Sequence, residues 1–180
     1  MSRVVLIAWV SAVTFSLGAC GQSATDTASK SRATAAPLTA AILGEQTVRS
    51  AEDYLAEDAY ASADISRGEA LSMRCRACHS LEEGGATIVG PNLFGVFGRT
   101  AGSVPDYPYS GALSASAFVW TPRALDAWLA KPFAFLPGNR MSFPGLSERQ
   151  DRNGLIAYLL QYTDSGIEAG SADSVTESRD

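Results

Sequence analysis

The chain has 180 residues, 46% of them hydrophobic, and a formal net charge of −5 at pH 7. This length allows one ordinary domain with appendages, and the apolar content is sufficient for one compact core. No nucleic-acid partner is expected.

The first predicted element is an export signal over residues 1–19. Arg3 precedes an apolar run from Val4 to Leu17, and small residues then lead to Cys20. This pattern is typical of a bacterial lipoprotein signal, in which the cysteine is lipidated and becomes the mature N-terminus. Two alternatives stay open: an uncleaved transmembrane anchor, for which the run is short, and cleavage that leaves a soluble protein. In each case the rest of the chain lies outside the cytoplasm.

Residues 20–64 are predicted to be a lipid-anchored flexible linker. Ala, Ser and Thr dominate up to about Pro37, and they cannot bury enough apolar surface to offset the entropy of ordering. A short helix is expected near residues 47–59, resting on the domain or free of it. The domain itself is predicted over residues 65–163, and the acidic residues 164–180 are predicted to form a disordered tail.

Three helices are predicted in the domain. The first begins near Ile65, with Asp64 or Ser66 as its cap, and runs up to a pair of cysteines. The second begins at Thr121-Pro122, a capping residue with proline at the first helical position, and ends at Lys131-Pro132. The third follows Ser147-Glu148 and has apolar residues at helical spacing over 155–160.

The stretch from Gly84 to Ser116 is rich in glycine and proline and follows neither the helical nor the strand period. We therefore expect an ordered loop. A loop of this length in a compact domain needs an object to fold around.

The sequence Cys75-Arg76-Ala77-Cys78-His79 indicates what that object is. A Cys-x-x-Cys-His run places two thiols on one turn, so that both can add to the vinyl groups of one haem, and the next residue offers its imidazole to the iron. The alternatives are a zinc half-site, a thioredoxin-like redox pair or chance. Zinc requires a second ligand cluster, yet Cys20 is the only other cysteine and His79 the only histidine. A thioredoxin motif requires a preceding buried strand, which the sequence does not predict.

Met141 is the candidate for the opposite face of the iron. A thioether is a weak neutral ligand that favours ferrous iron and closes the site to other ligands. The chain has three methionines: Met1 lies in the signal, and Met73 is too close to Cys75 to reach the other haem face. The alternative is a methionine that fills a gap in the core.

Taken together, residues from about 66 to 163 resemble a class I cytochrome c, close to mitochondrial cytochrome c and its periplasmic bacterial relatives. Besides the cysteine motif, the matching stretches are Gly90-Pro91-Asn92-Leu93-Phe94-Gly95, Phe97-Gly98-Arg99, Trp120, residues 136–143 and residues 155–159. The resemblance implies an all-α fold of three main helices and ordered loops around one covalently bound haem, with the first and last helices crossing.

The resemblance also implies roles for residues around the haem. Pro91 matches the residue whose carbonyl accepts from the proximal imidazole, as a group that orients a metal ligand should. Arg99, Tyr109 and Trp120 match the donors around a buried propionate, which must be hydrogen-bonded or charge-paired out of water. Surface charge for Arg99 and plain core packing for Tyr109 and Trp120 are the alternatives.

Among the departures from the family pattern, two concern the methionine ligand and the exposed haem edge. Trp128 stands where a tyrosine usually lies beside the methionine ligand, so the tuning of the potential is left open. Lysines often ring the exposed haem edge in relatives, whereas this domain has only Lys131. A modest positive face from Arg74, Arg76, Lys131 and Arg140 is one interpretation, and a solvated surface is the other.

The sequence thus predicts a membrane-tethered, extracytoplasmic, monomeric electron carrier with one haem c. The resemblance implies a cytochrome bc complex as donor and a terminal oxidase or photosynthetic reaction centre as acceptor. A small haem enzyme or gas-binding protein with an open iron site is the alternative function.

Overall fold

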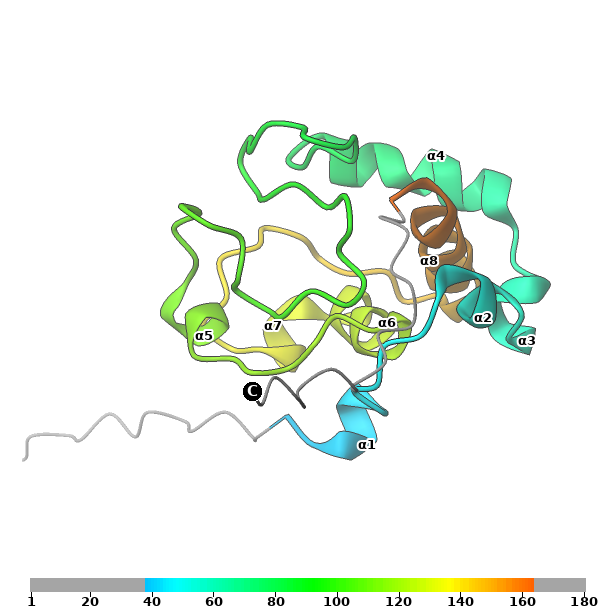
Figure 1. Ribbon diagram of the computed structural model, residues 1–180, viewed down its shortest axis with the longest axis horizontal. Coiled ribbons are helices and arrows are strands. Elements are labelled where there is room, and N and C mark those ends of the chain that lie inside the picture. Colours follow the sequence, from blue (N-terminus) through cyan, green and yellow to red (C-terminus); the bar gives the residue numbers. More distant parts are fainter. Residues whose placement is uncertain (1–37, 164–180) are drawn as a thin grey trace, which may run out of the picture. The chain divides into compact units, whose positions relative to one another are not determined.

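The computed structural model describes residues 38–163. Regular structure in this range is helical, apart from a single antiparallel bridge between Thr100 and Val119 (Figure 1). The three longer helices are α4 (Ile65–Arg76), α6 (Pro122–Ala130) and α8 (Arg149–Tyr162). The five short helices are α1 (Ala40–Leu43), α2 (Ala51–Leu55), α3 (Asp58–Ala61), α5 (Gly111–Ser114) and α7 (Pro132–Phe135). The expected all-α class with three main helices is therefore confirmed.

Local chemistry explains where the long helices begin. The carboxylate of Asp64, rather than Ser66, caps α4 by accepting from the backbone N–H of Arg67 at 2.9 Å. The hydroxyl of Thr121 caps α6 through the N–H of Ala124 at 3.2 Å, and Pro122 occupies a position where no N–H is needed. Helix α8 follows Glu148 without a side-chain cap.

Helices α4 and α8 cross and pack closely against each other, as the resemblance implied (Figure 1). Two glycines allow this approach. A Cβ at Gly68 would overlap the carbonyl of Gly154, and a Cβ at Gly154 would lie 2.5 Å from the carbonyl oxygen of Asp64. Because any side chain at either position would push the helices apart, the crossing depends on both glycines.

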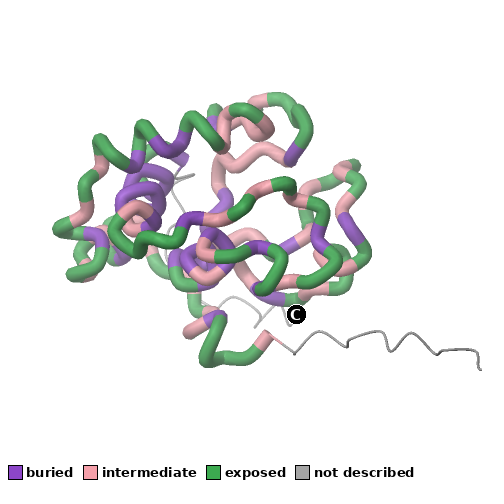
Figure 2. The backbone as a smooth tube through the Cα atoms, turned by 180° about the vertical axis from the view of Figure 1, so that it is seen from behind, coloured by how far each residue is buried: buried purple, intermediate pink, exposed green. Residues whose placement is uncertain are grey.

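The core is centred on α8, where residues 154–160 are all buried (Figure 2). The buried face of α6 joins this core through Leu125, Trp128 and Leu129. Between α6 and the bridge lies a group of edge-to-face and stacked aromatic rings, Phe118, Trp120, Trp128 and Phe135. Helix α8 and this aromatic group thus belong to the same core.

The N-terminal segment, residues 38–64, corrects the linker prediction over that range. It forms α1, α2 and α3 and packs on α6 and α8, with Leu43, Tyr54 and Tyr60 buried at 8%, 6% and 7% exposure. Burying two aromatic side chains and a leucine offsets the ordering entropy that the small residues alone could not. The expected short helix is observed as two, α2 and α3.

The predicted signal over residues 1–19, Cys20, the linker residues 20–37 and the tail 164–180 lie outside the described residues. Within residues 38–163, no helix is long and apolar enough to cross a membrane.

Candidate haem site

The cysteine motif lies at the C-terminal end of α4. Cys75 is in the last turn of the helix, and the N–H groups of Cys78 and His79 both donate to its carbonyl, at 3.0 and 2.8 Å. The chain therefore makes one tight turn that brings both thiols and the imidazole together. Both thiols are free. Burial raises the pKa of the Cys75 thiol to about 11, which is the opposite of the low pKa that a redox-active pair requires.

The His79 imidazole has one nitrogen fixed and the other available. Its Nδ1 lies 2.7 Å from the carbonyl oxygen of Pro91. Because a carbonyl can only accept, Nδ1 must carry the proton and Nε2 must present its lone pair. Burial lowers the pKa of His79, although the Pro91 carbonyl acts against this, so the neutral form is favoured. Gly90 makes room for the ring, since a Cβ there would overlap it.

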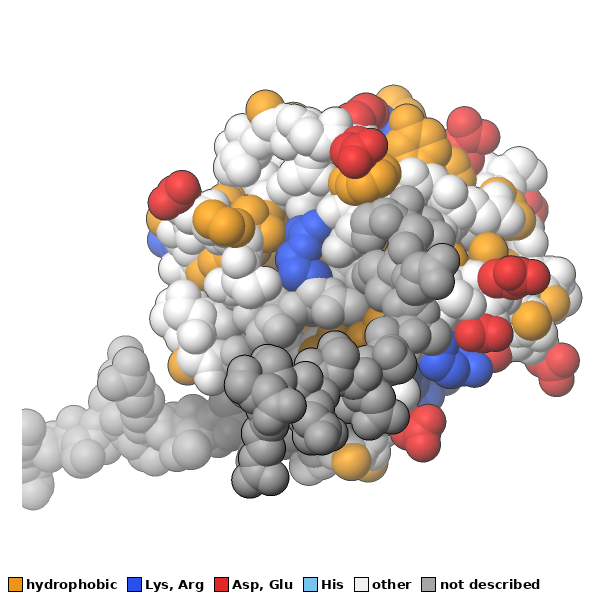
Figure 3. Space-filling view, viewed as in Figure 1, with side chains coloured by type: hydrophobic (Ala, Val, Ile, Leu, Met, Phe, Trp, Pro, Cys, Tyr) orange, Lys and Arg blue, Asp and Glu red, His pale blue; other side chains and the backbone are white. Residues whose placement is uncertain are grey.

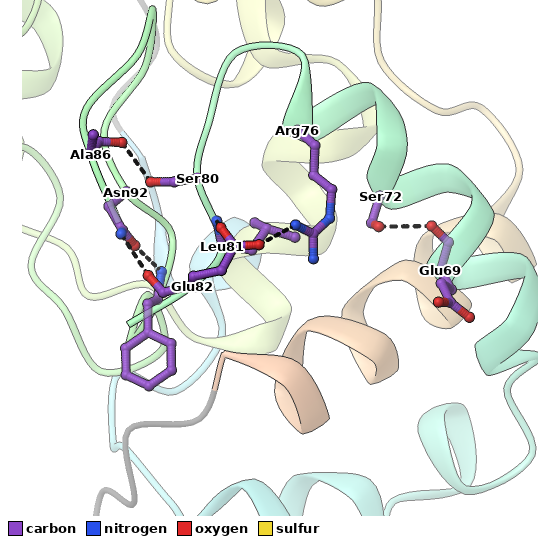
Figure 4. A network of polar contacts seen from close by, with 9 residues as sticks. Glu69, Ser72, Arg76, Ser80, Leu81, Glu82, Ala86 and Asn92 are labelled. Atoms are coloured by element: carbon purple, nitrogen blue, oxygen red, sulfur yellow. Dashed lines mark hydrogen bonds and ion pairs between the residues drawn. The ribbon is translucent and has the colours of Figure 1, made fainter. Parts of the chain in front are cut away.

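The loop after the motif is held by polar contacts among its own residues (Figure 4). The Asn92 amide donates to the carbonyls of Glu82 and Gly85, at 2.8 and 2.7 Å. Ser80 donates to the carbonyl of Ala86 at 2.6 Å. The carbonyl of Cys78 accepts from residues 89 and 90, at 3.1 and 2.8 Å. These bonds place Pro91 beside His79 without any regular element.

Arg76 links the turn to α8. Its guanidinium pairs with Glu82 (Figure 4) and lies over the ring of Tyr162, 4.9 Å from the centroid. Tyr162 in turn stacks on Tyr158, with centroids 5.4 Å apart. Contacts with Tyr158, Glu82 and Tyr162 raise the pKa of Arg76, so it stays a cation. Because the Glu82 carboxylate offsets this charge, Arg76 contributes less to a positive surface.

Met141 lies in the loop between α7 and α8, and Asn139 determines the shape of that loop. The buried Asn139 amide donates to the carbonyls of Pro132 and Leu136, at 3.0 and 2.8 Å, and its oxygen accepts from the N–H of Met141 at 2.9 Å. Gly138 takes a positive φ of 87°, which a side chain would disfavour. The role of Asn139 is not evident from the sequence, although an asparagine beside a glycine is typical of turns.

The sulfur of Met141 accepts a hydrogen bond from Trp128. The indole Nε1 lies 3.2 Å from Sδ, and the Trp128 ring is only 5% exposed. Trp120 and Phe135 hold that ring edge-to-face, at centroid distances of 5.4 and 5.7 Å. The sequence placed Trp128 near the methionine, but only the structure reveals this bond.

Comparison with known proteins assigns the family. Over 100 residues the chain is 45% identical to a cytochrome c2 of Agrobacterium tumefaciens (strain II Chrys), a match that covers 54% of this chain and 90% of that protein. It is 36% identical over 115 residues to the cytochrome c2 of Afifella marina, a match that covers 62% of this chain and 93% of that protein. A cytochrome c of Sesamum indicum is 40% identical over 101 residues, covering 56% and 91%. No protein-family model matches.

The chain belongs to the class I c-type cytochromes. As a member of this family it is an electron carrier and not an enzyme, and its cofactor is a covalently bound haem c. The chemistry of the donor set fits that cofactor: two thiols on one turn, an imidazole with a free Nε2 and a thioether. Among the described residues no group of three or more histidine, cysteine or acidic side chains could hold a different metal.

In this cytochrome, Trp120 and Arg99, two of the residues matched to propionate donors, are joined through the backbone: the N–H of Trp120 donates to the carbonyl of Arg99 at 2.9 Å. The Arg99 charge acts to lower the pKa of the third, Tyr109. Burial raises the pKa of Tyr109, and it lowers the pKa of Arg99. The Arg99 guanidinium donates to the carbonyls of Asn92, at 2.7 Å, and Phe94. Within residues 38–163 it pairs with no carboxylate, so this half-buried cation lacks a countercharge from the described chain.

Proposed function

We propose that this cytochrome is a membrane-tethered, extracytoplasmic carrier of single electrons whose haem iron is bound by His79 and Met141. When bound, the haem supplies the one-electron couple. Cys75 and Cys78 hold the group by thioether bonds, and lipidated Cys20 holds the chain at the membrane on the periplasmic side.

The observation that carries this proposal is the hydrogen bond between His79 and Pro91. It leaves Nε2 as the only lone pair that the imidazole can offer, on the same turn as two free thiols. An outer hydrogen bond of this kind fixes the ring and increases its basicity as a ligand. Met141 can supply the second ligand, because the Trp128 N–H occupies one lone pair of its sulfur and leaves another for iron.

The propionate assignment of Arg99 rests on charge, and those of Tyr109 and Trp120 rest on their relation to Arg99. A half-buried guanidinium without a carboxylate partner among the described residues is costly, and a propionate would supply the missing negative charge. Arg99→Leu should therefore lower the reduction potential of the haem-loaded protein, because an uncompensated propionate favours ferric iron, while the thioether bonds keep the haem attached.

The partners that this reading implies are a cytochrome bc complex as donor and a terminal oxidase or reaction centre as acceptor, with the carrier as a monomer. The relatives named cytochrome c2 support partners of this general kind. Four arginines of the described residues are paired with carboxylates, which leaves few cations for binding a redox partner. We therefore expect a transient docking surface with little charge.

The test uses the full-length protein purified with its haem. On a denaturing gel, haem should migrate with the polypeptide, and Cys75→Ala combined with Cys78→Ala should abolish this. Ferric protein added to bacterial membranes should be reduced on addition of quinol, and the ferrous protein should be reoxidised in air. Haem that acid acetone extracts from the wild type, or a protein that membranes neither reduce nor oxidise, would overturn the proposal.

A further inference from the structure

The N-terminal segment, residues 38–64, reaches the start of α6 through two hydrogen bonds. The side-chain oxygen of Gln46 accepts from the N–H of Val119 at 2.6 Å, and the Arg123 guanidinium donates to the carbonyl of Ala41 at 3.2 Å. Leu43 is buried beside them. These contacts fix the chain immediately before and after Trp120, where it enters α6.

Trp120 connects this contact to Met141. Its ring packs on Trp128, and the Trp128 N–H bonds the Met141 sulfur at 3.2 Å. Three contacts therefore connect Gln46 to the thioether. Gln46 bonds the backbone next to Trp120, the Trp120 ring packs on Trp128, and Trp128 bonds the Met141 sulfur. Interiors packed in this way transmit displacements, because there is no free volume to absorb them.

A second route joins the same segment to the far end of the methionine loop. Tyr60 is buried against α6 and α8 near Asp126, which forms a buried ion pair with Arg152 at 2.7 Å. Arg152 also donates to the carbonyls of Leu146 and Ser147, both at 2.8 Å. The N–H of Leu146 donates to the carbonyl of Leu129 at 2.8 Å. The loop that begins at Asn139 is thus anchored to α6 and α8, the two helices that the segment covers.

We propose that the N-terminal segment is a positioning element for Met141, which keeps the thioether on the iron by holding α6 and its tryptophans in place. The proposal rests on the ligation proposed above. Methionine is a weak neutral ligand, and unlike His79 it is not on the covalently attached side of the site. The fraction of molecules with an open iron is therefore set by how firmly the protein holds the loop. Gln46 and Leu43 act through α6 and are positioning residues.

The test measures imidazole binding to the ferric, full-length, haem-loaded protein, because imidazole must displace Met141. Gln46→Ala and Leu43→Ala should each bind imidazole about three- to tenfold more tightly than the wild type, as expected when one buried contact is lost. Gln46→Glu keeps an acceptor for the Val119 N–H and should restore the wild-type affinity. Glu52→Gln, on an exposed residue of the same segment, should leave it unchanged.

A destabilised variant distinguishes positioning from general loss of stability. Gly68→Ala strains the α4–α8 crossing and leaves the contacts of Gln46 and Leu43 in place, so for the same loss of melting temperature it should change the imidazole affinity less than Gln46→Ala does. If Gln46→Ala and Leu43→Ala lower the melting temperature but not the imidazole dissociation constant, the segment is only structural and the inference is wrong. If the wild type itself lacks the far-red sulfur-to-iron band, the ligation fails first and the inference falls with it.

Discussion

At the scale of single residues, the surroundings of the Met141 sulfur decide how the iron is tuned. Trp128 donates its indole N–H to Sδ, and an indole, unlike the phenol of a tyrosine, cannot accept in return. The donated hydrogen bond withdraws electron density from the thioether. It should therefore favour ferrous iron beyond what the ligand alone does.

Trp128→Phe should lower the reduction potential, because a sulfur without this hydrogen bond donates more strongly and stabilises ferric iron. The loss of one weak hydrogen bond is worth about 1 kcal/mol, and at 59 mV per tenfold change the expected shift is roughly 40 mV. A potentiometric titration measures it. Phe133→Leu, an exposed aromatic on α7, is the control. An unchanged potential in Trp128→Phe would show that the bond is absent in the loaded protein.

Some residues of the haem site could be predicted from the sequence and others could not. The sequence predicted the thiols, His79 and Met141 because each belongs to a short motif with its own chemistry. It did not predict the bond from Trp128 or the role of Asn139, because these depend on how α6 and the methionine loop meet in space. Propensity and spacing carry no information about such contacts between distant segments.

At the scale of elements, the crossing of α4 and α8 carries much of the packing. Gly68→Ala should destabilise the protein by about 2–4 kcal/mol, because the new methyl group overlaps the Gly154 carbonyl and the helices must separate. Urea unfolding followed by circular dichroism measures the loss. Gly111→Ala is the matched control, since a Cβ there meets nothing within 4 Å and should change little. Equal stability of both variants would mean that the helices are not in such close contact.

The packing of α3 predicts a response to alkali. Burial and then Asp126 raise the pKa of Tyr60 from 10.0 to about 12. Because the folded pKa exceeds the unfolded one, the stabilisation from keeping Tyr60 neutral is complete below pH 10 and is lost as the pH rises toward 12. Tyr60→Phe has no such proton and should lose less stability over that range, as melting temperatures would show. A parallel decline in both proteins would contradict the burial of this hydroxyl.

The elements that the sequence predicted correctly are those with strong local signals. Helices α4 and α6 have a capping side chain, and α8 has apolar residues at helical spacing over 155–160. Helices α1, α2 and α3 are too short to be stable alone. Their three buried side chains, Leu43, Tyr54 and Tyr60, follow no helical period. Their order comes from packing on α6 and α8, which the composition of the segment could not reveal.

At the scale of the whole molecule, charge is unevenly distributed along the chain. Residues 38–64 have six carboxylates and one arginine, whereas residues 65–163 have nine basic and seven acidic side chains. Acidic groups gather over the part of the surface where α2 and α3 lie (Figure 3). The end of the described chain nearest the proposed anchor is thus the most acidic, and anionic lipid headgroups should repel it.

Cys20→Ser tests the tether. If Cys20 is lipidated, the variant should accumulate as unprocessed precursor or leave the membrane fraction, because stable anchoring requires two or more acyl chains. Fractionation followed by a haem stain measures this, with Ser23→Ala as a control substitution nearby. A Cys20→Ser variant that stays in the membrane fraction with the mass of the uncleaved chain, equal to that of the wild type, would rule out the lipid anchor and favour an uncleaved N-terminal span.

The most direct test of the central claim is the absorption spectrum of the full-length protein, ferric and then ferrous, with and without carbon monoxide. Ligation by His79 and Met141 predicts a weak far-red band in the ferric spectrum and a ferrous spectrum that carbon monoxide does not change at neutral pH. Met141→Ala should lose the band and bind the gas. Ready binding of carbon monoxide by the wild type would contradict the account, because it would show an open iron where a closed electron carrier is expected.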